Sequence, residues 1–94
     1  MSDIDVRDNA DRHRFELLID GELAGLADYR DRNGAVVVIH SEVDRRFRGQ
    51  GLGNVLAQRT LDQLRERGVK VIPACPFFAK YVSEHPEYAD LVAP

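Results

Sequence analysis

The sequence predicts an α/β (α+β) domain in which a mixed, mostly antiparallel sheet carries two main helices. Up to residue 43, short apolar runs are separated by the hairpin dipeptides Asp20-Gly21 and Asn33-Gly34. Apolar residues then recur at helical spacing, and a short apolar run follows that helix. At 94 residues the chain has room for one core, so we expect residues 1–94 to form a single domain.

The first strands are predicted from alternation. Residues 4–9 form the weakest pattern and suit a short edge strand. In residues 13–19, Phe15, Leu17 and Ile19 share one face and Glu16 lies on the other, which is typical of a half-buried strand. Asp-Gly and Asn-Gly dipeptides favour tight hairpin turns because both central positions need positive φ. The sequence therefore predicts that these strands pair antiparallel.

Two further strands follow. In residues 22–30, Leu23, Ala27 and Tyr29 fall on one face. Residues 36–39 are β-branched at every position, which predicts a central strand covered on both faces.

A helix and a return strand come next. Residues at helical spacing begin at residue 52, and Gly68 suits the left-handed position just after the helix. The apolar face of this helix consists of Leu52, Leu56, Ala57, Thr60, Leu61 and Leu64. Residues 69–74 predict a short buried strand, so the central strand, this helix and the return strand form one βαβ unit.

Prolines define the C-terminal part. Pro73 cannot donate a ladder hydrogen bond and predicts an edge, a bulge or a local separation of strands. Pro76 suits the first turn of a second helix that reaches about Glu84, and Pro86 ends it.

Composition excludes several classes of protein. A formal net charge of −3 argues against broad nucleic-acid binding, which needs a basic face. A single cysteine forms no internal disulfide and suits a reducing compartment. Residues 1–11 are acidic and lack the apolar stretch of a signal peptide, and no apolar run approaches the roughly 20 residues of a membrane span. We expect a cytoplasmic domain with neither a membrane nor a metal as partner.

The segment Arg45-Arg46-Phe47-Arg48-Gly49-Gln50-Gly51-Leu52-Gly53 carries the strongest functional signal. Glycines at alternate positions let successive amides turn toward one point at the start of a helix, where free N–H groups and the helix dipole bind anions. The neighbouring arginines add phosphate contacts. A phosphate loop of the Gly-Lys-Ser/Thr type is absent, and Asn54 stands where a dinucleotide fingerprint needs glycine or alanine.

Strand, then Arg48-x-x-Gly51-x-Gly53, then helix resembles the pyrophosphate loop of the GNAT superfamily of N-acetyltransferases, whose pattern is Gln/Arg-x-x-Gly-x-Gly/Ala. In that family the loop amides hold the pyrophosphate of coenzyme A, and the preceding strand pairs with its pantetheine arm. The resemblance implies a βαβ acetyl-CoA-binding unit in a minimal GNAT-like fold whose parallel strands splay apart, as Pro73 allows. The implied cofactor contacts are Val43, Arg48, Gly49, Gln50, Gly51, Leu52 and Gly53.

Three further segments point to one group within this superfamily. Residues 40–43 before the loop, and residues 71–77 and 85–88 after it, resemble the short YjdJ-type GNAT-like proteins. The likeness covers roughly residues 13–92. Larger GNAT enzymes carry N-terminal helices that help shape the acceptor site, whereas this sequence passes from strand to hairpin there.

Four residues are candidates for catalysis. Neutralising a lysine amine at pH 7 costs about 4.6 kcal/mol, so His40 or Glu42, which share strand parity at the end of the central strand, are candidate bases. Cys75 lies near the start of the second helix, and the resemblance implies that it lines the acetyl site, which makes it a candidate nucleophile. The resemblance also implies that Tyr81 protonates the departing thiolate. Each has an ordinary structural alternative: solvated strand-end residues, a packed thiol and a packed tyrosine.

The predicted function is binding of acetyl-CoA and transfer of its acetyl group to an amine, directly or through Cys75. Two alternatives remain open: an acyl-CoA-binding or sensing module without efficient catalysis, and an interaction domain whose glycine loop only tightens a strand–helix connection. The sequence identifies neither the amine nor the oligomeric state.

Overall fold

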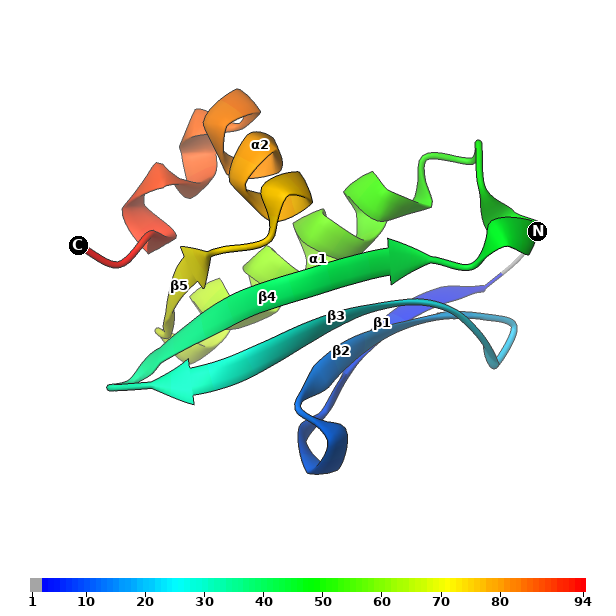
Figure 1. The fold of residues 1–94 in the computed structure, drawn as a ribbon, viewed down its shortest axis with the longest axis horizontal. Coiled ribbons are helices and arrows are strands. Elements are labelled where there is room, and N and C mark those ends of the chain that lie inside the picture. Colours follow the sequence, from blue (N-terminus) through cyan, green and yellow to red (C-terminus); the bar gives the residue numbers. More distant parts are fainter. Residues whose placement is uncertain (1–2) are drawn as a thin grey trace.

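The computed structural model describes residues 3–94 and confirms the predicted fold class (Figure 1). The strands are β1 (Ile4–Asn9), β2 (Arg14–Ile19), β3 (Glu22–Arg32), β4 (Ala35–Val43) and β5 (Lys70–Pro73). The helices are α1 (Leu52–Arg67) and α2 (Pro76–Glu84), with short 3-10 turns at Ala10–Arg12, Arg45–Phe47 and Pro86–Leu91. The sequence did not predict these three turns. In the described residues 3–94, neither helix is long and apolar enough to cross a membrane.

The five strands lie in the sheet in their order along the chain. β1 to β4 pair antiparallel, and β5 joins β4 in parallel after α1, which confirms the βαβ unit. Both hairpins use the predicted dipeptides. Asp20 and Gly21 have φ of 50° and 83°, and Asn33 and Gly34 have φ of 51° and 82°, so each turn takes the left-handed conformation that Asp, Asn and Gly tolerate.

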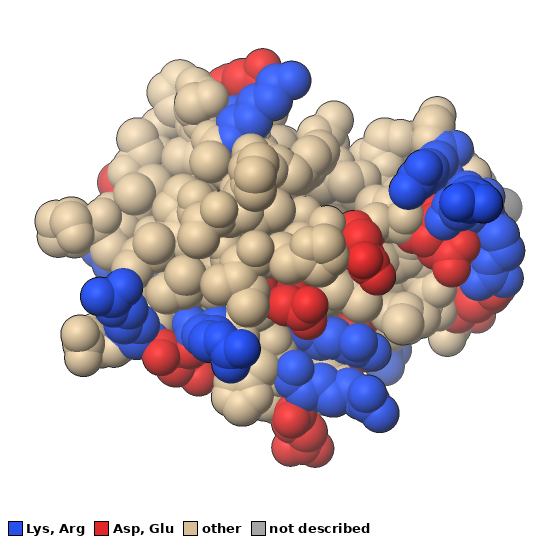
Figure 2. Space-filling model, in the orientation of Figure 1, with Lys and Arg blue, Asp and Glu red and all other residues tan. Residues whose placement is uncertain are grey.

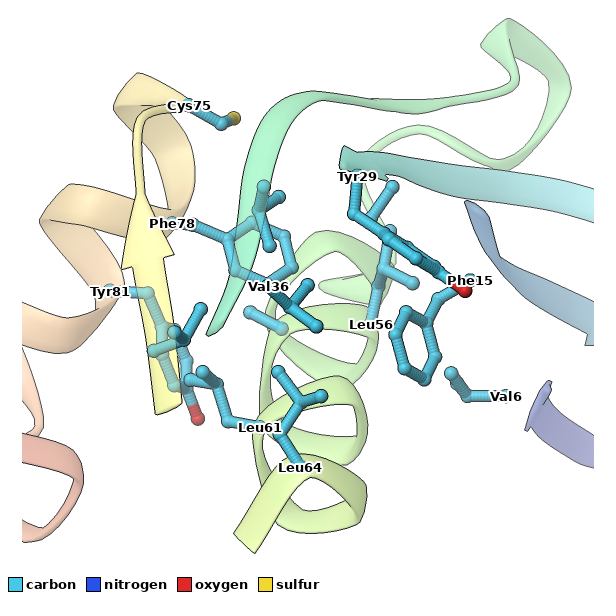
Figure 3. Close-up of a cluster of buried hydrophobic side chains, with 14 of the residues drawn as sticks. Val6, Phe15, Tyr29, Val36, Leu56, Leu61, Leu64, Cys75, Phe78 and Tyr81 are labelled. Atoms are coloured by element: carbon cyan, nitrogen blue, oxygen red, sulfur yellow. The ribbon is translucent and has the colours of Figure 1, made fainter. Parts of the chain in front are cut away.

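One face of the sheet packs on both helices (Figures 1 and 3). All six residues of the predicted apolar face of α1 are buried, and Gly68 ends the helix with φ of 68°. They meet Phe15 and Leu17 from β2 and Phe78 from α2 in a single cluster. Each leucine or phenylalanine of this cluster contributes roughly 1.5–3 kcal/mol when fully buried, so the cluster positions α1 against the sheet.

The other face of the sheet corrects two predictions. Val37 is half-buried and Ile39 is 40% exposed, so β4 is covered on one face and not on both. Leu23, expected beside Ala27 and Tyr29, is 38% exposed, whereas those two are buried. A bulge beside Leu17 pairs Leu18 with Leu23, and the extra residue on β3 turns Leu23 to the helix-free face.

The parallel strands separate halfway along β4. β5 pairs with β4 only from Ala35 to Val38, and its last residue, Pro73, has no N–H to extend the ladder. The amide of Cys75 then donates to the Val38 carbonyl at 2.8 Å, and α2 begins. From residue 39 to 43, β4 therefore has a neighbouring strand on its β3 side alone, within residues 3–94.

The outer edges of the sheet are both covered. Side chains of α1 reach over β1, where Arg59 donates to the Ile4 carbonyl and Gln63 to the Val6 carbonyl, the latter at 2.7 Å. At the opposite edge Val92 bridges to Val71 of β5. The C-terminal residues thus act as a short substitute strand beside β5.

Candidate active site

The loop between β4 and α1 presents a row of backbone amides. Gly51 is the N-cap of α1 with φ of 71°, and no side chain caps the helix. Gly49 has φ of 83°. Within residues 3–94, no protein acceptor receives the N–H groups of residues 49 to 54, and Val55 is the first to bond back, to the Gly51 carbonyl. The loop therefore combines free donors with the positive end of the helix dipole, as an anion site requires.

The three loop arginines differ in their contacts. Arg46 pairs with Asp44 and, at 2.6 Å, with Glu22, and these carboxylates raise its pKa. Hydrogen bonds from Arg46 lower the pKa of Asp44. In the part of the chain that the structure describes, Arg45 and Arg48 are exposed and make no ion pair. Figure 2 shows basic side chains gathered at the end of the molecule where Figure 1 places this loop.

Two adjoining hollows form a groove beside the loop. The first, of about 250 Å³, is lined by all the predicted cofactor residues except Gln50, which is exposed. The second, of about 210 Å³, continues along Ser41, Glu42 and Val43 of β4 and is also lined by Leu56 of α1. Figure 2 shows the surface indented between α2 and the loop. The groove thus follows the part of β4 that is not paired with β5.

Phe77 lies across this groove and lines both hollows. Its ring is 41% exposed and rests on Gly53. A Cβ atom at Gly53 would lie 2.9 Å from Cζ of the ring, closer than van der Waals contact allows. The last glycine of the loop therefore lets α2 approach α1.

Backbone groups of β4 also face the groove. The Asp44 amide donates to the Ala24 carbonyl at 2.7 Å. Because alternate residues of an antiparallel strand bond the same neighbour, His40 and Glu42 direct their backbone groups to β3. The N–H and C=O groups of Ser41 and Val43 consequently point to the open side.

Cys75 faces Ser41 across the gap between the strands. The thiol Sγ lies 3.2 Å from the Ser41 hydroxyl oxygen, and Cys75 is 4% exposed. Cys75 is also the N-cap of α2. Sequence reasoning missed Ser41, although it shares strand parity with the predicted Val43 and precedes the basic loop.

The candidate bases lie on the opposite face of the sheet from the thiol. His40 Nε2 and the Glu42 carboxylate are 3.0 Å apart and both are exposed. Their register partners are Asp28 and Leu26, whereas Ser41 pairs with the buried Ala27. His40 and Glu42 share a face, as expected from parity, but this face is the one without helices.

Tyr81 is not brought to Cys75. It is buried, and its ring stacks on His85 with centroids 3.8 Å apart. Burial raises its pKa, helped by the charges of Glu87 and Asp62. Figure 3 shows the Tyr81 hydroxyl and the Cys75 sulfur at opposite ends of the buried cluster. The tyrosine therefore packs between α2 and the C-terminal turn.

Comparisons with known proteins agree with the fold. Residues 14–91 match the family model described as GCN5-related N-acetyltransferase. The chain is 30% identical over 98 residues to Protein NATD1 of Xenopus tropicalis, covering 99% of this chain and 89% of the relative. The solution structure of a GCN5-like protein from Staphylococcus aureus shares the fold, with a TM-score of 0.72 at 22% identity over 99% of this chain and 91% of that one. The chain belongs to the family of GCN5-related N-acetyltransferases.

Proposed function

We propose that the protein binds acetyl-CoA in the groove along β4 and transfers the acetyl group to an amine. The observation that carries this proposal is the groove that runs from the six free amides of residues 49 to 54 to Ser41, whose hydroxyl contacts the buried thiol of Cys75. Membership of an acetyltransferase family supports the type of reaction.

The loop suits a pyrophosphate. Its amides supply donors without any desolvation of charged side chains, and the dipole of α1 adds favourable potential. Arg48, free of carboxylates within residues 3–94, supplies a charge-assisted contact. Beyond the loop, the outward N–H and C=O groups of Ser41 and Val43 match the amides of a pantetheine arm, which then takes the place of a missing strand.

The far end of the groove suits a thioester. The start of α2 and the Ser41 hydroxyl stabilise negative charge on a sulfur there. In the direct route, the amine attacks the acetyl carbonyl and the C–S bond to coenzyme A breaks. In the alternative route, the Cys75 thiolate first takes the acetyl group as coenzyme A leaves, and the amine then attacks that new thioester.

The acceptor amine must lose a proton in either route. For an amine that arrives from the helix-free face, His40 and Glu42 are the proposed acceptors of that proton, since both are exposed there. Protonation of the departing thiolate by Tyr81 is the proposed role with least geometric support, because the hydroxyl lies away from the sulfur.

Calorimetric titration with acetyl-CoA tests the proposed function. Wild type is compared with an Arg48→Ala, Gly51→Val double variant, whose folding is checked by circular dichroism. We expect the folded double variant to lose binding, because Gly51 needs its positive φ to aim the amides. Absence of binding by the wild type at millimolar ligand would exclude the proposal and leave the loop as a structural connection.

A binding or sensing module without turnover is the second candidate. It is favoured by the placement of His40 and Glu42 away from the thiol and by the bare sheet face, where no helix of residues 3–94 forms an acceptor pocket. Mass spectrometry after incubation with acetyl-CoA and a panel of amines separates the two. Acetylated amine supports the enzyme, and binding without any product from wild type supports the module.

A further inference from the structure

The helix-free face of the sheet exposes apolar side chains. Of the three large apolar side chains that are exposed within residues 3–94, Leu23 and Ile39 lie on this face, and Phe77 lies in the groove. The register between β3 and β4 skips Ile39, so this residue shares the helix-free face with His40. The pairing of β4 with β5 ends at Val38, one position earlier. Ile39 therefore borders the gap between these two strands.

The charges on this face change sign along the strands. Near the gap they are acidic, since Asp28 lies opposite His40 in the register and Glu42 follows on the same face. Arg30 and Arg32 come next on the same face of β3, toward the second hairpin. Because a strand advances about 3.4 Å per residue, the two arginines lie roughly 7 and 14 Å beyond Asp28. The face thus offers carboxylates near the gap and guanidinium groups further away.

Arg30 and Arg32 are exposed, and within residues 3–94 neither forms an ion pair. Asp31 lies between them in the sequence, but alternation turns it to the other face, where its carboxylate is 4.0 Å from the ring of His13. Five other arginines are held by carboxylates, namely Arg7, Arg14, Arg46, Arg65 and Arg67. The two guanidinium groups of β3 are therefore available to carboxylates of another molecule.

We propose that the acceptor amine is the side chain of a lysine in a protein segment, and that acidic residues near this lysine bind Arg30 and Arg32. The inference rests on the proposed function, in which the amine reaches the thioester from the helix-free face. A lysine at the gap has its ammonium near Glu42 and Asp28 and its alkyl stem against Ile39. Since two residues of an extended segment span roughly 7 Å, carboxylates two and four positions from the lysine reach the two arginines.

A docked segment supplies the wall that the chain itself lacks at this face. No helix of residues 3–94 covers it, so the bound segment is what surrounds the reacting lysine. In the transfer, the lysine nitrogen forms a bond to the acetyl carbon and the bond from that carbon to sulfur breaks. The proton of the amine passes to His40 or Glu42. A small amine without carboxylates makes no contact with the arginines and binds more weakly.

The test compares two short, N-terminally blocked peptides as acetyl acceptors at low ionic strength. Each has one central lysine. The first carries glutamates two and four positions to either side of the lysine, and the second carries glutamines there. Wild type should show a kcat/KM about threefold or more higher for the glutamate peptide, mainly through a lower KM, and added salt should reduce the difference.

Variants of the two arginines separate docking from catalysis. Arg30→Met and Arg32→Met each keep an apolar stem and remove one charge, so each should reduce the preference. Lys80→Met removes the same charge from an exposed position on α2, on the other side of the sheet, and should keep the preference. The double variant Arg30→Glu, Arg32→Glu should favour a peptide with arginines in place of the glutamates, a reversal that misfolding does not produce.

Four outcomes would overturn the inference. Equal kcat/KM of wild type for both peptides would remove the acidic residues from the docking and leave the proposed function intact. Equal values together with a molecular mass of two chains in sedimentation would assign the face to a second copy. Acetylation of spermidine but of neither peptide would show that the acceptor is not a protein lysine. If wild type acetylates no amine at all, the transfer fails, and this inference fails with it.

Discussion

At the scale of single residues, the contact between Ser41 and Cys75 joins β4 to the start of α2, beyond the point where the pairing of β4 with β5 ends. The two atoms lie 3.2 Å apart, and the hydroxyl is the side-chain hydrogen-bond partner that the structure gives the thiol. A hydroxyl that donates to sulfur stabilises the thiolate, whereas one that only accepts from S–H stabilises the thiol. The direction of this hydrogen bond decides how reactive Cys75 is.

We predict that Ser41→Ala slows alkylation of Cys75 by iodoacetamide at pH 7 by about three- to tenfold, since a hydrogen bond to a charged group is worth roughly 1.5–3 kcal/mol and burial limits its full effect. Rates are normalised to those of the urea-unfolded protein. Ser83→Ala is the matched control, because that exposed hydroxyl only contacts the Lys80 carbonyl. An unchanged or faster rate in Ser41→Ala would show that the hydroxyl does not stabilise the thiolate.

Sequence reasoning named the loop residues and Cys75 as candidates but did not name Ser41. Glycine spacing and basic charge are local signals, so Arg48 and Gly51 stand out in the sequence alone. The hydrogen-bond partner of the thiol lies 34 positions away in the sequence, so only the folded structure identifies it. His40 and Glu42 were correctly predicted to share a face, but which face meets the helices depends on the sheet as a whole.

At the scale of elements, the approach of α2 to the first turn of α1 depends on Gly53. A methyl group there would meet the Phe77 ring at 2.9 Å. The ring is partly exposed and can move, so the cost falls on the groove and not on the core.

We therefore predict that Gly53→Ala leaves the melting temperature nearly unchanged and weakens acetyl-CoA binding by about threefold or more. Alanine favours the helix by up to about 1 kcal/mol, which offsets the displaced contact. The displaced ring narrows the groove. Adding Phe77→Ala to Gly53→Ala should remove the effect of the methyl group, and an equal effect of Gly53→Ala in both backgrounds would contradict this coupling.

The boundaries of the elements were predicted correctly where a turn or helix end is marked by a glycine, a proline or a turn dipeptide. The turns at Asp20 and Asn33, the end of α1 at Gly68 and the span of α2 from Pro76 all match. The bulge at Leu17 was missed. The extra residue lies on β3, opposite Leu17 and Leu18, and the alternation of either strand read alone does not reveal it. The exposure of Leu23 follows from that bulge.

At the scale of the whole molecule, three buried tyrosines link stability to pH. Burial, followed by hydrogen bonds to Asp8 and Asp62, raises the pKa of Tyr29 and of Tyr88 above their usual range. Burial likewise raises the pKa of Tyr81. These hydroxyls connect β3 to β1, and the C-terminal turn to α1.

We predict that the free energy of unfolding falls as the pH rises past about 10. The unfolded chain loses its tyrosine protons near pH 10 while the folded chain retains them, so each tyrosine costs up to about 1.4 kcal/mol per pH unit there. Urea denaturation at pH 8 and pH 11 measures the loss. Tyr88→Phe should be less stable at pH 8, where its hydrogen bond is intact, and should show a shallower decline. A decline as steep as that of wild type would show that Tyr88 is not among the titrating groups.

The stretch of β4 that lacks a neighbouring strand bears on whether molecules of this protein can associate by strand addition. The outer edges of the sheet are covered, by α1 side chains over β1 and by Val92 against β5. Within residues 3–94, the main-chain groups of Ser41 and Val43 are unpaired and lie in the narrow slot beside β4. A strand from another molecule would bring side chains on both of its faces into this slot, where they would meet the exposed ring of Phe77. A thin, flexible chain of amides enters without such bulk. If the proposed function holds, this slot admits a slender cofactor, and we expect the side chain of Phe77 to hinder the strand addition between copies that begins fibre growth.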